Sequence, residues 1–553
     1  MKNKILTIAT ICFAIVFFAA CKKPSSQLAL YVPADASVVF TIDIKTLTDK
    51  ITSSGLSIDS LTNLFSNPIG ESSLNWNDIQ NAGISLDKPV YVFFKEMNTM
   101  QLGNVRNSAF ISEVNDTKKL EAFLLNKKPG KNILSADKYR YIALGDDYVA
   151  GWTDKILIVL QVSGGNEAPG NYGTGEGTLS QQLLTTLFTQ KKSASIADAN
   201  GFEDMLAKPG DVHFYTNNTP GIAMDKIPGL SAVQPLIKDS YTAGVVNFEK
   251  GKVTASVLTH YSKELANMLN KYPSKQINTN MISNYPDTLT GFVILSFNTG
   301  IITDLLHYAG VDNMTDGYAS TLGFTSRDVV NAFSGDMALI FSYNRSTVPQ
   351  LSISHNVSYL LNFGIADNTL FDKVLNGLLN KELLTKDGDE YRMGHTGGQG
   401  FVIERGNNNL FIASSDKLIK SYESAGSTHT LPAGIEKKIS DKSMAMYLDI
   451  NHFLNDAGAA DTFTNINPRD NYSMFSISQS AKQTFKDFIV TTDKGDSKTA
   501  QADMELNFVN TNENSLASLI RFISFAKKDQ LKKRDNSSGS SPDNSHDEEN
   551  END

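Results

Sequence analysis

Cysteine is nearly absent from this 553-residue chain, which has only Cys12 and Cys21. Both lie close to the N-terminus, so the rest of the chain has no thiol for a disulfide, a thiolate metal site or a cysteine nucleophile. Such a chain must be stabilised by its hydrophobic core alone. Its length allows a large core and indicates more than one domain, because single cores stop growing near roughly 250–300 residues.

Signatures of catalysis are also lacking. The chain has no Gly-x-Ser-x-Gly elbow, no Walker-type Gly-Lys-Ser/Thr ending and no His-Glu-x-x-His motif. The net charge is −10 and no basic stripe with interleaved aromatics is present, so we expect no nucleic-acid partner. The eight histidines are scattered, and we interpret His213 and His307 as structural residues. We therefore predict no catalytic residues, no cofactor and no metal site.

Three polar stretches resemble ligand-binding loops. The Gly-rich segment Ser163 to Thr178 lacks the lysine of a phosphate loop, so we interpret it as a flexible insertion. The stretches Val311 to Tyr318 and Lys386 to Tyr391 resemble calcium loops. Met314 stands where an oxygen ligand is required, and the second stretch contains an Asp-Gly hairpin turn. We interpret both as turns, with a surface calcium site left open.

The N-terminus has the pattern of an export signal. Lys2 and Lys4 precede the apolar run Ile5 to Phe18, which is shorter than the roughly 20 residues that span a bilayer. The run leads into Phe-Ala-Ala-Cys21, which resembles a bacterial lipobox. The alternative is an ordinary signal peptide with a chance cysteine. The resemblance implies a diacylglycerol thioether on Cys21 and an additional acyl chain such as palmitate, and two or more chains anchor a protein stably.

Two distant stretches repeat one pattern. Val32 to Ile51 and Pro286 to Leu306 each contain a Pro/Asp turn, an apolar strand, an Asp or Asn and a helix-like segment. Further matched segments follow in the same order, which indicates internal duplication. We predict an α+β fold of two tandem, largely antiparallel sheet-plus-helix domains. The expected divisions are a signal peptide (1–20), a tether (21–28), repeat domain 1 (29–272), a linker (273–284), repeat domain 2 (285–528) and a disordered acidic tail (529–553).

The most regular polar feature is an Asp or Asn at the end of a strand. It recurs at Asp43, Asn217, Asn298 and Asp449. These side chains could form a ligand-binding ring, but helix capping and turn formation account for the same residue types and positions. We favour capping.

With the lipobox and the opening stretch Val32 to Leu47 in view, the chain resembles the bacterial lipoproteins grouped as domain of unknown function 4836. The resemblance implies an envelope location, lipid-anchored at the outer membrane and facing the periplasm in preference to the cell exterior. It implies no activity and no functional residues. We therefore predict a membrane-tethered, non-catalytic binding or scaffold protein, anchored through Cys21, whose partner is an envelope protein or glycan. The alternatives are an envelope hydrolase with a non-local carboxylate site, or a carrier of an apolar ligand between the two halves.

Overall fold

The computed structural model describes residues 27–60, 76–99, 103–145, 147–164, 178–218, 230–286, 288–343, 357–393, 401–424, 431–432, 434–456 and 468–538. Helices and one large antiparallel sheet make up these residues, so the predicted α+β class is confirmed. The lipobox with Cys21 and most of the Gly-rich segment lie outside the described residues. No helix in the described ranges is both long enough and apolar enough to cross a membrane.

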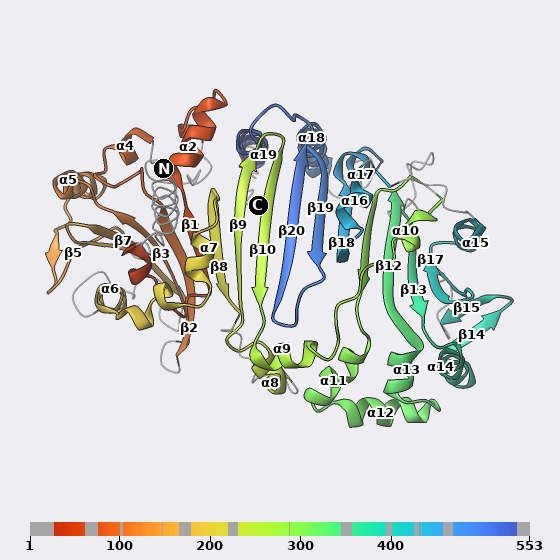
Figure 1. The fold of residues 1–553 in the computed structure, drawn as a ribbon. Helices are drawn as coiled ribbons and strands as arrows, with labels where there is room; N and C mark the ends of the chain where they lie inside the picture. Colours follow the sequence, from red (N-terminus) through yellow and green to blue (C-terminus); the bar gives the residue numbers. More distant parts are fainter. Residues whose placement is uncertain are drawn as a thin grey trace, which may run out of the picture.

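The sheet runs through both halves of the chain (Figure 1). The first half contains the strands β1 (Val38–Ile42), β2 (Val90–Thr99), β3 (Gly103–Glu113), β4 (Leu134–Ser135), β5 (Arg140–Ala143), β6 (Tyr148–Trp152), β7 (Ile156–Gly164), β8 (Val212–Asn217), β9 (Tyr241–Glu249) and β10 (Lys252–His260). The second contains β11 (Gly291–Ser296), β12 (Phe333–Tyr343), β13 (Val357–Ile365), β14 (Leu384–Asp387), β15 (Glu390–Met393), β16 (Val402–Arg405), β17 (Asn409–Ala413), β18 (Lys442–Asp449), β19 (Phe485–Asp493) and β20 (Thr499–Phe508).

The two halves pair their strands in one order. The first half runs β4-β5-β6-β7-β3-β2-β1-β8-β9-β10. The second runs β14-β15-β16-β17-β13-β12-β11-β18-β19-β20. The last strands of the halves, β10 and β20, pair with each other from Lys252↔Asn507 to His260↔Thr499. The halves therefore share one continuous sheet, and their origin by duplication stays a prediction.

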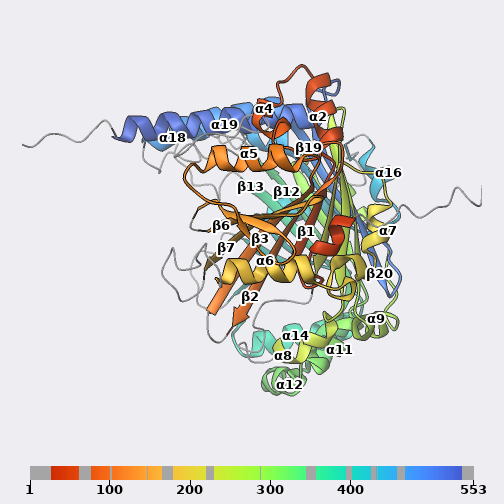
Figure 2. The ribbon, with the colours of Figure 1, turned by 90° about the vertical axis from the view of Figure 1, so that its left-hand side faces the viewer.

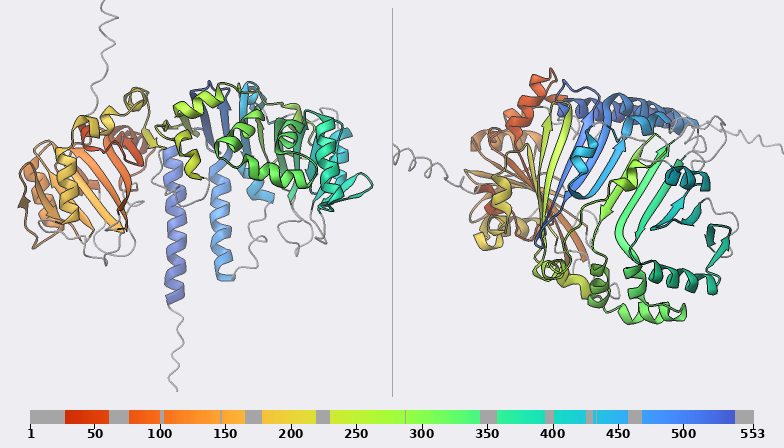
Figure 3. Two further views of the ribbon diagram at one scale, coloured as in Figure 1. Left: turned by 90° about the horizontal axis from the view of Figure 1, so that it is seen from below. Right: turned by 45° about the vertical axis from the view of Figure 1, so that its right-hand side comes forward.

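Helices lie between the strands along the chain in both halves. The first half has α2 (Ile44–Ser53), α4 (Trp76–Gln80), α5 (Thr117–Lys127), α6 (Leu179–Thr189), α7 (Phe202–Leu206), α8 (Leu230–Val233) and α9 (Lys263–Leu269). The second has α10 (Asn280–Ser283), α11 (Gly300–Tyr308), α12 (Asp312–Thr321), α13 (Ser326–Ala332), α14 (Asn368–Asn380), α15 (Asp416–Ser424), α16 (Ile435–Ile439), α17 (Ile450–Asp456), α18 (Pro468–Thr484) and α19 (Ser515–Ser538). In the view from below, α18 and α19 extend side by side away from the sheet (Figure 3).

Alternating strand residues build a core on each face of the sheet. In the first half, Leu157 of β7 packs with α5, whereas Ile158 packs with α6. Successive side chains of a strand point to opposite faces, which places α5 and α6 on opposite sides (Figure 2). In the second half, α14 and α15 likewise cover the two faces. The core of each half therefore has two layers.

Several segments expected outside the domains are part of the fold. The predicted tether ends at Leu28, which is buried in a 3₁₀ turn (Gln27–Tyr31). The predicted linker 273–284 contains α10 and buries Ile277 and Met281 in the second core. Helix α19 continues to Ser538, into the segment predicted as a disordered tail. The remaining tail, 539–553, lies outside the described residues.

Candidate functional site

A large apolar cavity lies within the second half, between α11, α12, α13, α14 and one face of the sheet. Its volume is about 720 Å³. The sheet supplies Phe363, Leu410 and Ile412 to its floor. These residues alternate with core residues of the opposite face, as a strand period of two requires. We call this space the apolar cavity.

Helices from a single insertion form much of the wall. The chain leaves β11, forms α11, α12 and α13, and enters β12; these three helices gather at one end of the strands (Figure 1). Ala319 of α12 is buried against Phe324 and Val374. The outer side of α12 carries Met314, which is 70% exposed. Helix α12 therefore covers the cavity with one side and presents the other to solvent.

One polar group lies at the edge of the apolar cavity. The carboxylate of Asp336 accepts hydrogen bonds from Ser296 Oγ at 2.7 Å and Ser334 Oγ at 2.8 Å. Lys275 Nζ lies 3.6 Å from the same carboxylate. Because this charge has partners, it is tolerated beside an otherwise apolar wall. The cavity is thus suited to a hydrocarbon body with a polar end.

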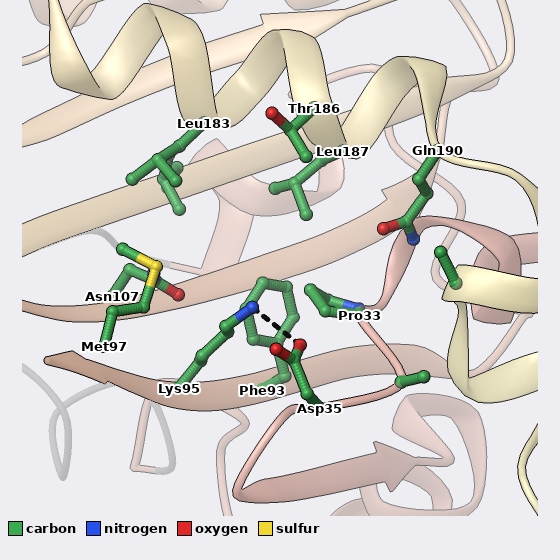
Figure 4. Close-up of a pocket in the computed structure, with 13 residues that line it drawn as sticks. Pro33, Asp35, Phe93, Lys95, Met97, Asn107, Leu183, Thr186, Leu187 and Gln190 are labelled. Atoms are coloured by element: carbon green, nitrogen blue, oxygen red, sulfur yellow. Dashed lines mark hydrogen bonds and ion pairs between the residues drawn. The ribbon is translucent and has the colours of Figure 1, made fainter. Parts of the chain in front are cut away.

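A second, smaller apolar cavity lies in the first half. It measures about 340 Å³ and is bounded by α6, β2, β3 and β7. Figure 4 shows Leu183 and Leu187 of α6 directed into it, opposite Phe93. Lys95 Nζ and Asp35 Oδ1 pair across its mouth at 2.6 Å. Each half therefore contains an apolar cavity with an ion pair at one side. The two cavities do not correspond in position, because one lies under α6 and the other under α14, and these helices cover opposite faces of the sheet.

The four strand-end residues do not form a ring. Strands β1 and β8 are antiparallel, with Ile42 opposite Val212, so Asp43 and Asn217 lie at opposite ends of the pair. The same geometry separates Asn298 from Asp449 on β11 and β18. Antiparallel pairing thus rules out the ligand-binding ring.

Local hydrogen bonds account for three of these residues. Asp43 Oδ1 accepts from Thr46 N at 2.9 Å and caps α2. Asp449 Oδ1 accepts from His452 N at 2.8 Å, and Asn298 Oδ1 accepts from Gly300 N at 3.1 Å. Asp43 and Asp449 therefore cap helices, whereas Asn298 forms a turn before α11, whose N-cap is Thr299. Asn217 ends β8, two residues before the stretch 219–229, which lies outside the described ranges.

The histidines and the calcium-like loops have local structural roles. His213 is buried, and its Nε2 lies 2.8 Å from Lys208 O. His307 is exposed, with Nδ1 2.7 Å from Asp312 Oδ2. The Asp-Gly turn at 386–391 joins β14 to β15 with Gly388 at φ 64°, as predicted. The turn predicted at 311–318 is wrong, because most of it forms α12.

A carboxylate cluster lies at the far end of the second half. Oxygens of Glu390, Glu404 and Asp416 lie within 4.8 Å of one another. Lys420 Nζ, 2.5 Å from Asp416 Oδ2, supplies a neighbouring positive charge. The cluster lines neither apolar cavity, and the hydrolase alternative stays a prediction.

Sequence reasoning missed the apolar cavity because its lining comes from five separate stretches between Phe297 and Ile412. No local motif marks such a site. One signal was present: the segment between the first two strands of the second half contains three helices, with the exposed apolar residues Met314 and Tyr318. An exposed Met and Tyr on a short helix are a feature of surfaces beside binding sites.

Comparisons with known proteins do not identify a family. No family model and no curated protein matches the chain. Solved structures of a protein named TP0453 align with part of it. Crystal form III has 12% identity and a TM-score of 0.24, covering 45% of this chain and 87% of that one. Crystal form IV has 10% identity and a TM-score of 0.25, covering 46% and 87%.

Proposed function

We propose that this protein is a non-catalytic binding protein of the cell envelope, tethered through Cys21, that binds a ligand with a long hydrocarbon chain in the apolar cavity. The observation that carries the proposal is the cavity of about 720 Å³ lined almost entirely by apolar side chains. Its size falls within the range of roughly 300–1,000 Å³ typical of small-molecule sites. The site lies within the second half rather than between the halves.

Packing energetics support this function. Protein interiors are close-packed, and residual cavity volume lowers stability. An open apolar space of this size leaves side chains in contact with water that a close-packed core would bury, so it is suited to binding an apolar ligand. Filling it with a hydrocarbon chain removes apolar surface from water, which contributes about 25 cal/mol per Å². The Asp336–Lys275 pair places charged groups at the edge of this apolar surface.

The test is a pair of substitutions on α12. Ala319 is buried and faces the cavity, whereas its neighbour Ser320 is exposed. Ala319→Phe should fill the cavity and lower affinity for a fluorescent fatty acid, 11-(dansylamino)undecanoic acid, at least tenfold. Ser320→Phe adds the same ring on the outer side and should leave the affinity unchanged. Both are made in a Cys21→Ser background, so that the fluorescence titration needs no detergent.

Two results would contradict the proposal. One is that the parent protein does not bind the dansyl probe, or that added palmitate does not displace the bound probe. The other is an Ala319→Phe protein that binds normally while its circular dichroism and unfolding midpoint match the parent. Leu378→Trp, on the α14 wall, provides a second block if Ala319→Phe does not fold.

A further inference from the structure

A second hollow lies on the other face of the strands that form the apolar cavity. Its volume is about 860 Å³. Asn362 of β13 and Phe411 of β17 line it, whereas their neighbours Phe363 and Leu410 line the apolar cavity. Because adjacent residues of a strand face opposite sides of the sheet, the two spaces are separate. We call this second space the amide hollow.

Primary amides dominate the amide hollow. Seven asparagines line it, from α10 and its flanks, from β13 and from the turn before β17. Asn280 and Asn407 are exposed at its rim. Each asparagine offers a carbonyl acceptor and two N–H donors without a net charge. The hollow is therefore rich in both donors and acceptors.

The arginine beside the hollow already has partners. Arg405 forms an ion pair with Asp372, and its Nη2 donates to Asn368 Oδ1 at 3.0 Å. Its guanidinium also lies over the Phe371 ring, 5.4 Å from the centroid. Because these contacts hold Arg405 toward α14, the hollow does not present it as a free site for an anion. A neutral polar ligand fits better than a phosphate or carboxylate.

Asn362 at the base of the hollow has an unused acceptor. It is 1% exposed, and its Nδ2 donates to Tyr422 Oη at 2.9 Å. Burial raises the pKa of Tyr422 to about 12, so the phenol keeps its proton and donates to Met281 O at 2.9 Å. Asn362 Oδ1 has no hydrogen-bond partner within the described part of the chain. A buried acceptor without a donor is unfavourable.

The first half shows that the fold does not need this amide. Ile111 of β3 precedes the capping Asp116 by the same distance that Asn362 precedes the capping Asp367. Both positions are buried, and each lies opposite an apolar residue, Ile158 or Phe411. The fold therefore accommodates a buried apolar side chain at this position of the sheet. In the second half the amide at 362 instead holds Tyr422, a residue that lines the hollow.

We propose that the amide hollow binds a neutral saccharide. Sugar hydroxyls both donate and accept hydrogen bonds, so neighbouring hydroxyls can pair with the N–H and C=O groups of several asparagines. Asn362 orients Tyr422, which also lines the hollow, through its Nδ2 and so fixes the shape of the base. A hydrocarbon would leave the asparagine groups unpaired, so the ligand of the amide hollow differs in class from that of the apolar cavity.

The experiment titrates the Cys21→Ser protein with maltohexaose and with chitotetraose, using isothermal calorimetry and saturation-transfer NMR. At least one probe should bind. The double substitution Asn280→Ala/Asn407→Ala removes two exposed rim amides and should lower the affinity at least tenfold. Asn362→Leu, which keeps the branched shape of asparagine, should also lower the saccharide affinity at least tenfold. Asn376→Ala, an exposed amide on α14 outside the hollow, should bind as the parent does.

The outcomes separate this site from the apolar one. Ala319→Phe should retain saccharide binding while losing the dansyl fatty acid, and the rim double substitution should show the reverse. If neither probe binds the parent protein, or if the rim double substitution binds as tightly as the parent, the saccharide site is excluded. Because the rim residues are exposed, they decide the matter even if Asn362→Leu is unstable.

Discussion

At the scale of single residues, Glu404 has unfavourable electrostatic surroundings. It is 7% exposed and lies directly across from Glu390 in the β15–β16 pair. Burial raises the pKa of the Glu404 carboxyl, and the charges of Asp416, Glu423 and Glu390 raise it further, against the opposing effect of Lys420. Like charges directly opposite in a sheet are destabilising.

The substitution Glu404→Gln should therefore stabilise the protein at pH 7.5 by roughly 0.2–1 kcal/mol, the usual size of a cross-strand pair effect. The folded state holds the Glu404 proton more tightly than the unfolded state, so ionisation reduces stability as pH rises above the unfolded pKa of about 4.3. The difference in unfolding free energy between Glu404→Gln and the parent should accordingly vanish near pH 4. Urea unfolding at the two pH values measures it.

A matched control is Glu264→Gln on the exposed side of α9. Its effect should stay within about 0.5 kcal/mol, as for most surface substitutions. Equal unfolding free energies for Glu404→Gln and the parent at pH 7.5 would show that the carboxylate cluster is not strained.

Capping aspartates also occur at Asp116 and Asp367, which begin α5 and α14. Asp116 Oδ1 accepts from Lys118 N at 3.0 Å and Lys119 N at 3.1 Å. Asp367 Oδ1 makes the equivalent bonds to Thr369 N at 2.8 Å and Leu370 N at 3.0 Å. Such caps depend on a few consecutive residues, so local sequence is enough to predict them.

At the scale of elements, the contact of α14 with the loop between α12 and α13 sets the wall of the apolar cavity. Gly377 lies in the middle of α14, where glycine is unfavourable for a helix. A Cβ at this position would overlap the Leu322 carbonyl oxygen and lie 2.8 Å from Phe324 Cδ1. Close approach of two backbones therefore explains the glycine.

Two glycine substitutions should have opposite effects. Gly377→Ala should destabilise the protein by about 1–3 kcal/mol, as overpacking does, despite the better helix propensity of alanine. Gly317→Ala in α12 meets no atom within 4 Å and should stabilise by about 0.5–1 kcal/mol. Urea unfolding followed by circular dichroism compares them. A stabilised Gly377→Ala protein would contradict the packing of α14 described above.

Helix α12 shows where element prediction failed. The stretch Val311 to Tyr318 contains Asp, Asn and Gly, which favour turns. In the structure, Ala319 and Leu322 pack on Phe324 and α14, and Asp316 Oδ1 accepts from Ser326 N at 2.8 Å. Tertiary packing thus outweighed the local turn preference.

At the scale of the whole molecule, the β10–β20 pair joins the halves. Its ladder extends from Lys252↔Asn507 to His260↔Thr499. Asn514 Nδ2 also donates to Phe248 O at 2.9 Å, and Ile520 of α19 packs with Ile51 of α2 in the first half. The second half therefore contributes directly to the core of the first.

This junction predicts coupled unfolding. Both tryptophans, Trp76 and Trp152, lie in the first half, so tryptophan fluorescence reports its unfolding. Destabilising the second half by Gly377→Ala should shift the fluorescence midpoint together with the circular dichroism midpoint, because loss of β20 exposes the edge of β10. Two independent domains would instead leave the fluorescence midpoint at its parental value.

Local sequence was sufficient for the α+β class, the order of most strands and the helix caps. Those features depend on residue periodicity and on contacts between near neighbours in the chain. The repeated pattern predicted matched segments in the two halves, but the order in which their strands pair came from the structure.

Only the tertiary structure decided where the cavities lie and how the halves meet. The apolar cavity gathers residues from Phe297 to Ile412, and its floor depends on which strand face Phe363 and Asn362 take. A shift of one residue in register would exchange them. The β10–β20 pair joins strands that are hundreds of residues apart, a contact that no local pattern encodes.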